Sequence, residues 1–167
     1  MHTTEHVSDL QTWQRIIAKS FVPMSVEPYL DAPKNSLFEA KITRVQAGFV
    51  GLSLIKSDPH IVDRSSDMVR RYPADYIKIS FQIEGAAKLQ QHGREIKIHP
   101  GQMSLYEARA PYRISFPTRS ESIILQAPKH VLSLSDLQIS DQAATLFSPA
   151  PGLRELLEAQ FNFLKRK

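Results

Sequence analysis

The chain has 167 residues, of which 42% are hydrophobic; this suffices for one domain with a buried core and argues against intrinsic disorder. It contains no cysteine, which excludes disulfides, thiolate catalysis and cysteine-ligated metal centres. The net charge of +4 comes from dispersed basic residues, so a nucleic-acid surface has little support. The sequence shows neither a signal-peptide pattern nor an apolar run of membrane-spanning length, so we expect a cytoplasmic protein without a membrane partner.

The first expected element is an amphipathic helix over about residues 9–20. Ser8 and Gln11 have capping-box spacing, and apolar residues then recur at helical intervals as far as Phe21. Pro23 ends this helix and belongs to a proline-rich passage, "VPMSVEPYLDAPKNS", that interrupts regular structure. Residues 1–35 are therefore predicted to be an N-terminal helix and a proline-rich lead-in.

Short runs rich in β-branched and aromatic residues follow, over residues 36–128. Because no helical spacers separate these runs, they predict antiparallel strands in a sandwich, a jelly roll or a small barrel. The eight expected strands have the sequences LFEAKITRV, VGLSLIKS, YIKISFQIE, AAKLQQ, REIKIH, QMSLYE, YRISF and SIILQA.

The run YIKISFQIE alternates with a period of two, so it has one apolar and one polar face. The apolar face, with Ile77 and Phe81, is more typical of plain core, and the polar face, with Ser80 and Gln82, is either a pocket wall or a wet surface. The pattern does not show which face points into a barrel.

A hairpin is expected over "AAKLQQHGREIKIH", with its turn at His92 and Gly93. In this register Leu89 faces Ile96 on the apolar side, and the opposite side is wet. His99 then lies at the far end of its strand, several residues from His92 at roughly 3.3 Å each, so the two histidines cannot share one metal ion.

Other residues that serve in metal or catalytic sites do not form a recognisable arrangement. His60 and His130 are expected in loops or on the surface. Glu84 and Glu107 stand near strand ends, where carboxylates are usually solvated. With no paired histidines, no nucleophile elbow and no phosphate loop, we expect no metal, no other cofactor and no catalytic residues.

The last part of the chain, residues 129–167, is predicted to be helical. Ser148 and Pro149 provide a plausible helix start, and an apolar stripe follows over about residues 150–166. The stripe must pack against the strand domain, against a second copy, or against both. The residues expected to form a homodimer contact are Leu153, Leu156, Leu157, Phe161 and Leu164.

The order and spacing of "DYIKISFQIEGAAKLQQHGRE", "PGQMSLYEARAPYRISF" and "SIILQAPKHVL" resemble the N-terminal effector-binding and dimerisation domain of AraC/XylS-type transcriptional regulators. The resemblance extends from Trp13 to about Leu164. It implies a mainly β fold with flanking helices: a cupin-like antiparallel jelly-roll barrel, an N-terminal helix and a C-terminal helical dimerisation segment. It also implies that DNA is contacted only through a C-terminal half that this chain lacks. Metal-bearing cupins place histidine ligands around a turn like Pro100-Gly101, but the matching strands here carry Ser, Gln, Leu and Tyr.

Such a barrel would bind a small effector in a mostly apolar pocket with a few polar groups. Aromatic side chains can stack on an aromatic ligand and an arginine can pair with a carboxylate, although Arg113 is equally compatible with a surface position. The candidate ligand-binding residues are Trp13, Tyr76, Ser80, Gln82, Tyr106, Tyr112 and Arg113.

Three functions are compatible with these patterns. The first is an effector-sensing, dimerising regulatory domain, and it is the one we favour. The second is a small cupin-type enzyme, an isomerase or oxygenase, which would need a metal triad that the sequence lacks. The third is a structural dimerisation module without a ligand.

Overall fold

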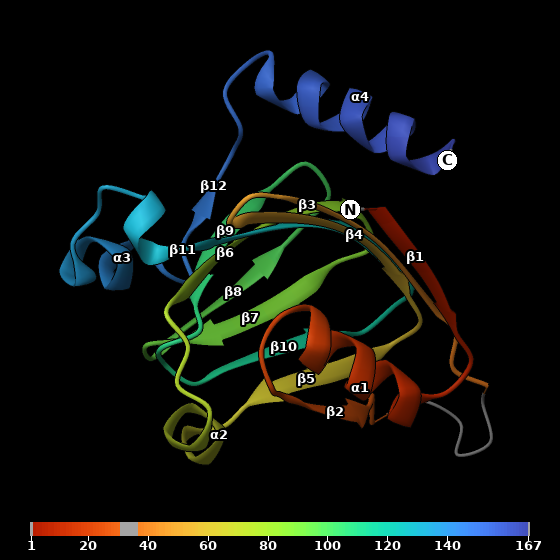
Figure 1. Cartoon of the computed structure of the whole chain (residues 1–167), viewed down its shortest axis with the longest axis horizontal. Coiled ribbons are helices and arrows are strands. Elements are labelled where there is room, and N and C mark those ends of the chain that lie inside the picture. The colour runs from red at the N-terminus through yellow and green to blue at the C-terminus, as the bar shows by residue number, and fades with distance from the viewer. Residues whose placement is uncertain (1, 31–36, 167) are drawn as a thin grey trace.

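The structure is a computed structural model that describes residues 2–30 and 37–166; for residues 154, 158, 161, 164 and 165 it describes the backbone alone. Strands dominate it, and helices lie around them (Figure 1). The strands are β1 (His2–Val7), β2 (Ser25–Pro28), β3 (Ala40–Ala47), β4 (Val50–Ser57), β5 (His60–Arg64), β6 (Tyr76–Glu84), β7 (Ala87–Gln91), β8 (Arg94–Ile98), β9 (Met103–Glu107), β10 (Tyr112–Phe116), β11 (Ser120–Pro128) and β12 (Leu146–Phe147). The helices are α1 (Leu10–Ser20), α2 (Ser66–Arg71), the short 3-10 helix η1 (Lys129–Val131), α3 (Asp136–Gln142) and α4 (Leu153–Lys165).

Two antiparallel sheets form the barrel. The seven-stranded sheet has the order β1-β3-β4-β11-β6-β9-β12, and the five-stranded sheet has the order β2-β5-β10-β7-β8. Neighbours such as β4 and β11 are far apart in the sequence, which is the connectivity of a jelly roll rather than of a simple meander. All eight strands expected from the sequence are present, and the mainly β, jelly-roll expectation is confirmed.

Four strands come from segments in which no strand was expected: β1, β2, β5 and the two-residue β12, which interrupts the predicted helical part of the chain and pairs with β9. β1 pairs with β3 along its whole length although most of its residues are exposed, because it is an edge strand whose partner supplies the hydrogen bonds. β2 lies inside the proline-rich passage and ends at Pro28, which an edge strand tolerates. β5 contains His60, which is buried, so its expected surface position is wrong. The boundary expected at residues 35 and 36 lies outside the described residues, and the division into three segments stays a prediction.

Helix α1 begins one residue later than its capping-box spacing indicated. Asp9 is the N-cap, and its carboxylate accepts a hydrogen bond of 2.7 Å from the backbone N–H of Thr12. The Ser8 interpretation was therefore wrong, because the Asp9 backbone is extended and its carboxylate reaches the free N–H groups of the first turn. The helix ends at Ser20, shortly before Pro23, and it buries Trp13 and Ile17.

The β7–β8 hairpin has the expected register, with Leu89 opposite Ile96 and Lys88 opposite Lys97. Both turn residues have positive φ, 51° for His92 and 71° for Gly93, as a two-residue type I′ turn requires. Lys88 forms an ion pair of 3.0 Å with Glu95, which offsets the repulsion between the two lysines.

The alternation of β6 places its apolar face outside the barrel. Ile77 packs with Ile139 of α3, and Phe81 belongs to a cluster that Leu157 of α4 covers. Figure 1 shows α4 lying across the seven-stranded sheet and α1 lying beside β2 and β5. The opposite, polar face of β6 therefore faces the barrel interior, where Lys78 lines a cavity.

Helix α4 begins after Gly152 rather than at Ser148 and Pro149. Its predicted stripe is divided: Leu157 packs on the sheet, while Leu153 and Leu156 are 41% and 56% exposed. The side chains of Phe161 and Leu164 lie outside the described residues.

Candidate ligand-binding site

The barrel interior contains a cavity of about 50 Å³. Helix α1 and the residues after it form one wall, and strands of both sheets form the others. This volume holds a few water molecules and is far below the roughly 300–1,000 Å³ of typical ligand pockets. The lining residues are Trp13, Ile17, Phe21, Met24, Ile55, His60, Val62, Lys78, Tyr106, Tyr112, Ile114, Phe116, Ser122 and Ile124.

Lys78 is the polar centre of this otherwise apolar lining. Its side chain exposes 1% of its surface, and its Nζ donates a hydrogen bond of 2.8 Å to Tyr112 Oη. The ammonium group also lies 5.0–5.6 Å from the ring centres of Phe21, Tyr106 and Tyr112. Burial, and then the nearby Arg64 guanidinium, hold the pKa of Lys78 well below its ordinary value. No Asp or Glu is among the described residues that line the cavity.

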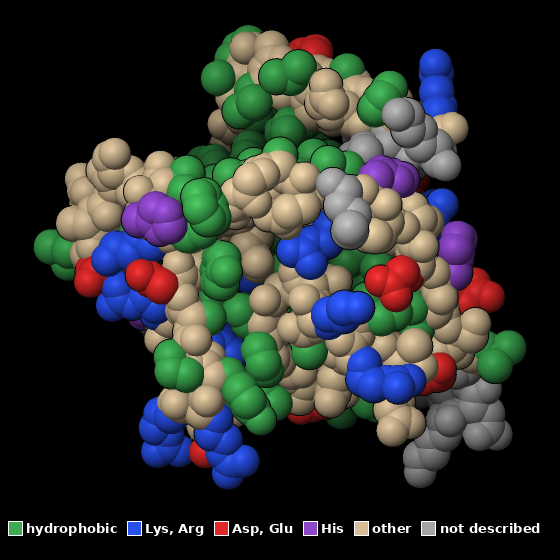
Figure 2. All heavy atoms as spheres, in the orientation of Figure 1, with side chains coloured by type: hydrophobic (Ala, Val, Ile, Leu, Met, Phe, Trp, Pro, Cys, Tyr) green, Lys and Arg blue, Asp and Glu red, His purple; other side chains and the backbone are tan. Residues whose placement is uncertain are grey.

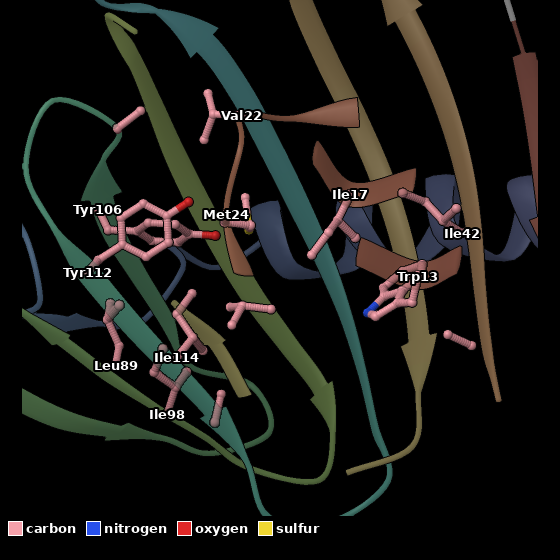
Figure 3. Close-up of a cluster of buried hydrophobic side chains, with 14 of the residues drawn as sticks. Trp13, Ile17, Val22, Met24, Ile42, Leu89, Ile98, Tyr106, Tyr112 and Ile114 are labelled. Atoms are coloured by element: carbon pink, nitrogen blue, oxygen red, sulfur yellow. The ribbon is translucent and has the colours of Figure 1, made fainter. Parts of the chain in front are cut away.

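Tyr106 and Tyr112 form the wall next to Lys78. Their ring centres lie 4.9 Å apart in an edge-on arrangement, and Figure 3 shows their hydroxyl groups pointing the same way. Burial raises the pKa of both phenols, so both stay neutral and can act as donors or acceptors. The cavity therefore presents one amine, two phenols and the hydroxyl of Ser122, with the neutral ring of His60, among apolar walls.

His60 connects the opposite wall to helix α1. Its Nε2 accepts a hydrogen bond of 3.1 Å from Trp13 Nε1, and its Nδ1 lies 2.8 Å from the carbonyl oxygen of Asp58. This pattern requires a neutral ring with the proton on Nδ1. Burial lowers the pKa of His60 to about 4. The ring also stacks on Phe116, with the centres 4.9 Å apart, so the Trp13 wall is fixed to β5 by polar and aromatic contacts.

Arg64 lies behind the cavity and is fully buried. Its guanidinium donates to three carbonyl oxygens: those of Ala108 at 3.0 Å, Pro23 at 2.8 Å and Tyr72 at 2.6 Å. These bonds hold together the passage after α1, the end of α2 and the β9–β10 connection. The charge of Arg64 thus lies near Lys78, while its hydrogen bonds serve the backbone.

The seven residues expected at a ligand site fall into three groups. Trp13, Tyr106 and Tyr112 line the cavity. Tyr76, Ser80 and Gln82 share the face of β6 that carries Lys78 but are not part of the lining; Tyr76 packs on the main core, and Ser80 and Gln82 are buried.

Arg113 lies elsewhere, on the outside of β10. Its guanidinium pairs with Glu27 at 3.2 Å and with Asp63 at 3.4 Å. It borders an open hollow of about 760 Å³ formed by the start of α2, the β7–β8 turn and the β9–β10 connection. Arg113 therefore lies outside the cavity lining, with two acids as its partners.

Sequence reasoning missed Lys78 and His60 as cavity residues. The signal for Lys78 was its position on the same face of β6 as Ser80 and Gln82, but it could be used only once that face was known to point inward. His60 gave no such signal, because it follows Asp58-Pro59 and its strand was not expected.

Two other expectations concern acids and metals. Glu107 is buried rather than solvated, because its strand lies between β6 and β12, and its carboxylate is 3.7 Å from His92 Nε2. Across residues 2–30 and 37–166, no three His, Asp or Glu side chains gather as metal ligands. In the same part of the chain, no helix is long and apolar enough to cross a membrane.

The fold and the cavity together define a cupin-like jelly-roll domain that encloses a small, aromatic-lined space. The chain belongs to the AraC-binding-like domain family, whose profile matches residues 13–162. An uncharacterised protein from the nit 5′ region of Bacillus sp. (strain OxB-1) is 27% identical over 136 residues, which cover 79% of this chain and 50% of that protein. The transcriptional activator NphR of Rhodococcus sp. is 26% identical over 86 residues, which cover 52% of this chain and 26% of NphR.

Among solved structures, the AraC-like transcriptional activator CuxR superposes with a TM-score of 0.79 and 19% identity, covering 98% of this chain and 60% of CuxR. At this identity the likeness concerns the fold. The chain spans about half the length of the Bacillus relative and less than two thirds of CuxR. The matched region is thus one part of these longer proteins.

Proposed function

We propose that this domain senses a small aromatic or carboxylate-bearing effector in the barrel cavity, with binding rather than catalysis as its role. The observation that carries the proposal is the cavity itself, in which one buried amine and two phenols stand among apolar walls. Such a lining is typical of a small-molecule site, since apolar contacts supply affinity and a few polar groups supply orientation. DNA would be contacted through a further domain, as the greater length of the relatives suggests.

The cavity in this structure is too small for an aromatic effector, so binding requires that a wall moves. The wall formed by α1 and the residues after it is the natural choice, because Phe21 and Met24 lie in a connection rather than in a sheet. A ligand that displaces this wall would strain the Trp13–His60 bond and shift α1 relative to β5. Helix α1 would then have one position when the cavity is empty and another when a ligand is bound. This change of position could transmit ligand binding to other parts of the protein.

The proposal can be tested by thermal melting of the domain with a library of small neutral, anionic and cationic aromatic compounds. A ligand of the folded state raises the melting temperature, and the rise grows with the logarithm of the ligand concentration above its Kd. Ser122→Ile replaces a hydroxyl by three carbon atoms on the cavity lining, a net gain of two heavy atoms, and should abolish the rise. Thr118→Ile, on an exposed loop, is the control. The proposal fails if no compound stabilises the wild type, or if stabilisation survives in Ser122→Ile.

We also propose that the domain forms a homodimer through the exposed face of α4. Leu153 and Leu156 expose apolar surface on this helix, and Leu146 and Phe147 of β12 do so nearby in the chain. Figure 2 shows hydrophobic side chains on the visible face of α4, and others in the seam between α4 and the sheet. A second copy is the expected occupant because paired half-sites on DNA require two regulators side by side.

The divided stripe gives a sharp test of dimerisation. Leu153→Glu with Leu156→Glu should yield a folded monomer, because both side chains face away from the sheet cluster. Leu157→Glu should instead lower stability by about 2–4 kcal/mol, because it places a charge against Phe81 and Met103. Sedimentation velocity at several concentrations, with far-UV circular dichroism on the same samples, measures both. A wild-type domain that stays monomeric at high micromolar concentration contradicts the proposal.

A further inference from the structure

Lys78 makes too few contacts to be explained as a structural residue. An ammonium group has three N–H donors, and among the described residues only Tyr112 Oη accepts one of them. Its charge is neither exposed nor paired with an acid: 1% of its surface is accessible, and Arg64 disfavours the charge further. A buried amine without an acidic partner lowers the stability of the ligand-free fold.

Arg64, the other buried cation near the cavity, makes the contacts that a structural cation is expected to make. Arg64 is also fully buried, but it donates to three backbone carbonyl oxygens and so holds three chain segments together. Lys78 donates only to the hydroxyl of Tyr112 among the described residues, and three aromatic rings lie around its amine. A methionine or leucine would fill the same space at lower cost, so the amine is better explained by something that it binds.

The charges around Lys78 select the kind of ligand. Its titratable and charged neighbours are Arg64, Tyr106 and Tyr112, and His60 also lines the cavity in its neutral form. None of these groups is anionic near neutral pH, because burial raises the pKa of both tyrosines. The field inside the cavity is therefore positive, and an anionic group is the partner that it favours.

We infer that the amine of Lys78 and the hydroxyl of Tyr112 bind the carboxylate of a small aromatic acid, whose ring occupies the apolar part of the cavity. This inference rests on the proposed function, since it names the chemical class of the effector. The carboxylate accepts from Lys78 Nζ and from Tyr112 Oη, which lie 2.8 Å apart and so can both reach one carboxylate group. Phe21, Ile114 and Phe116 supply apolar and aromatic surface for the ring.

Pairs of acids and their amides test the inference: benzoate with benzamide, phenylacetate with phenylacetamide, and 3-phenylpropanoate with its amide. Each amide has nearly the shape of its acid but no charge. Affinities can be measured by isothermal calorimetry and by the fluorescence of Trp13, which is the only tryptophan and lies in the cavity wall. We expect at least one acid to bind, with its amide binding at least tenfold more weakly.

Lys78→Met tests whether Lys78 binds the ligand or stabilises the fold. The variant should melt about 2–4 °C higher than the wild type without ligand and should bind the acid at least tenfold more weakly. Lys97→Met, on the exposed side of β8, should match the wild type in both respects. Tyr112→Phe keeps the ring and removes only the hydroxyl, so it should weaken binding of the acid severalfold. If Lys78→Met fails to fold, Tyr112→Phe provides the test of whether these two groups bind the carboxylate.

Three results would overturn the inference: Lys78→Met that retains acid binding, amides that bind as well as their acids, and a panel from which no acid binds. If only amides bind, the proposed function still holds, and only the claim that the effector carries a carboxylate is wrong. If no compound of the broader library raises the melting temperature of the wild type, the proposed function itself is wrong. Failure of the inference can thus be distinguished from failure of the proposed function.

Discussion

The neutral state of His60 makes a quantitative prediction about acid stability. The ring exposes 2% of its surface, and its Nε2 must stay unprotonated to accept from Trp13. Burial lowers the pKa of His60 from an ordinary 6.5 to about 4 in the folded protein. Because the unfolded chain takes up the proton first, stability is complete above about pH 6.5 and falls as the pH drops toward about 4. At about 1.4 kcal/mol for each pH unit, the loss at pH 4 amounts to about 3 kcal/mol.

Urea unfolding at half-unit steps from pH 4 to pH 7.5, followed by circular dichroism, measures this loss. His60→Gln removes the titration and keeps an amide that can accept from Trp13. Its stability should be lower than that of the wild type at pH 7.5 and should fall less steeply as the pH drops to 4. His99→Gln changes an exposed histidine and should retain the wild-type slope, including the part due to carboxylates. A His60→Gln variant as steep as His99→Gln would refute the assignment of the acid sensitivity to His60.

Two further predictions concern the frame around the cavity, and both can be measured by urea unfolding. Arg64→Met should lower stability by about 3 kcal/mol or more, because it removes a buried guanidinium that donates to three carbonyl oxygens. Arg113→Met, on the outside of β10, should change stability by less than about 1 kcal/mol, and similar losses in the two variants would contradict this reasoning. Gly85→Ala should cost about 2 kcal/mol or more, since its φ is +68° and a Cβ would lie 2.5 Å from the carbonyl oxygen of Arg119. Gly48→Ala, at φ +57° but facing open space, should cost about 1 kcal/mol, and equal losses would show that the Arg119 contact is unimportant.

Local patterns predicted the strands and the β7–β8 register well. The register follows from matching Leu89 with Ile96 around a two-residue turn, and both signals lie within one short segment. The N-terminal and C-terminal helices were also correct in kind, with their starts displaced by one to a few residues.

The cavity could not be predicted in the same way, because it depends on contacts between distant segments. Period-two alternation gave the two faces of β6 but not their direction, which is set by α3 and α4 packing on Ile77 and Phe81. His60 and Trp13 are 47 residues apart, and neither sequence neighbourhood indicates the other. Arg113 was a reasonable candidate by type, but its acidic partners come from β2 and β5, strands that were not expected.

The central claim is that the effector site is the enclosed cavity and not the larger open hollow beside Arg113. Two-dimensional ¹H–¹⁵N NMR of the domain, titrated with the best acid of the panel, tests it directly, because the single indole N–H belongs to Trp13 and is bonded to His60. We predict a saturable shift of the indole signal together with the backbone signals of Lys78, Tyr106 and Tyr112. Shifts confined to the residues around the hollow, such as Gln90, Gly93 and Arg113, with an unchanged indole signal, would contradict it.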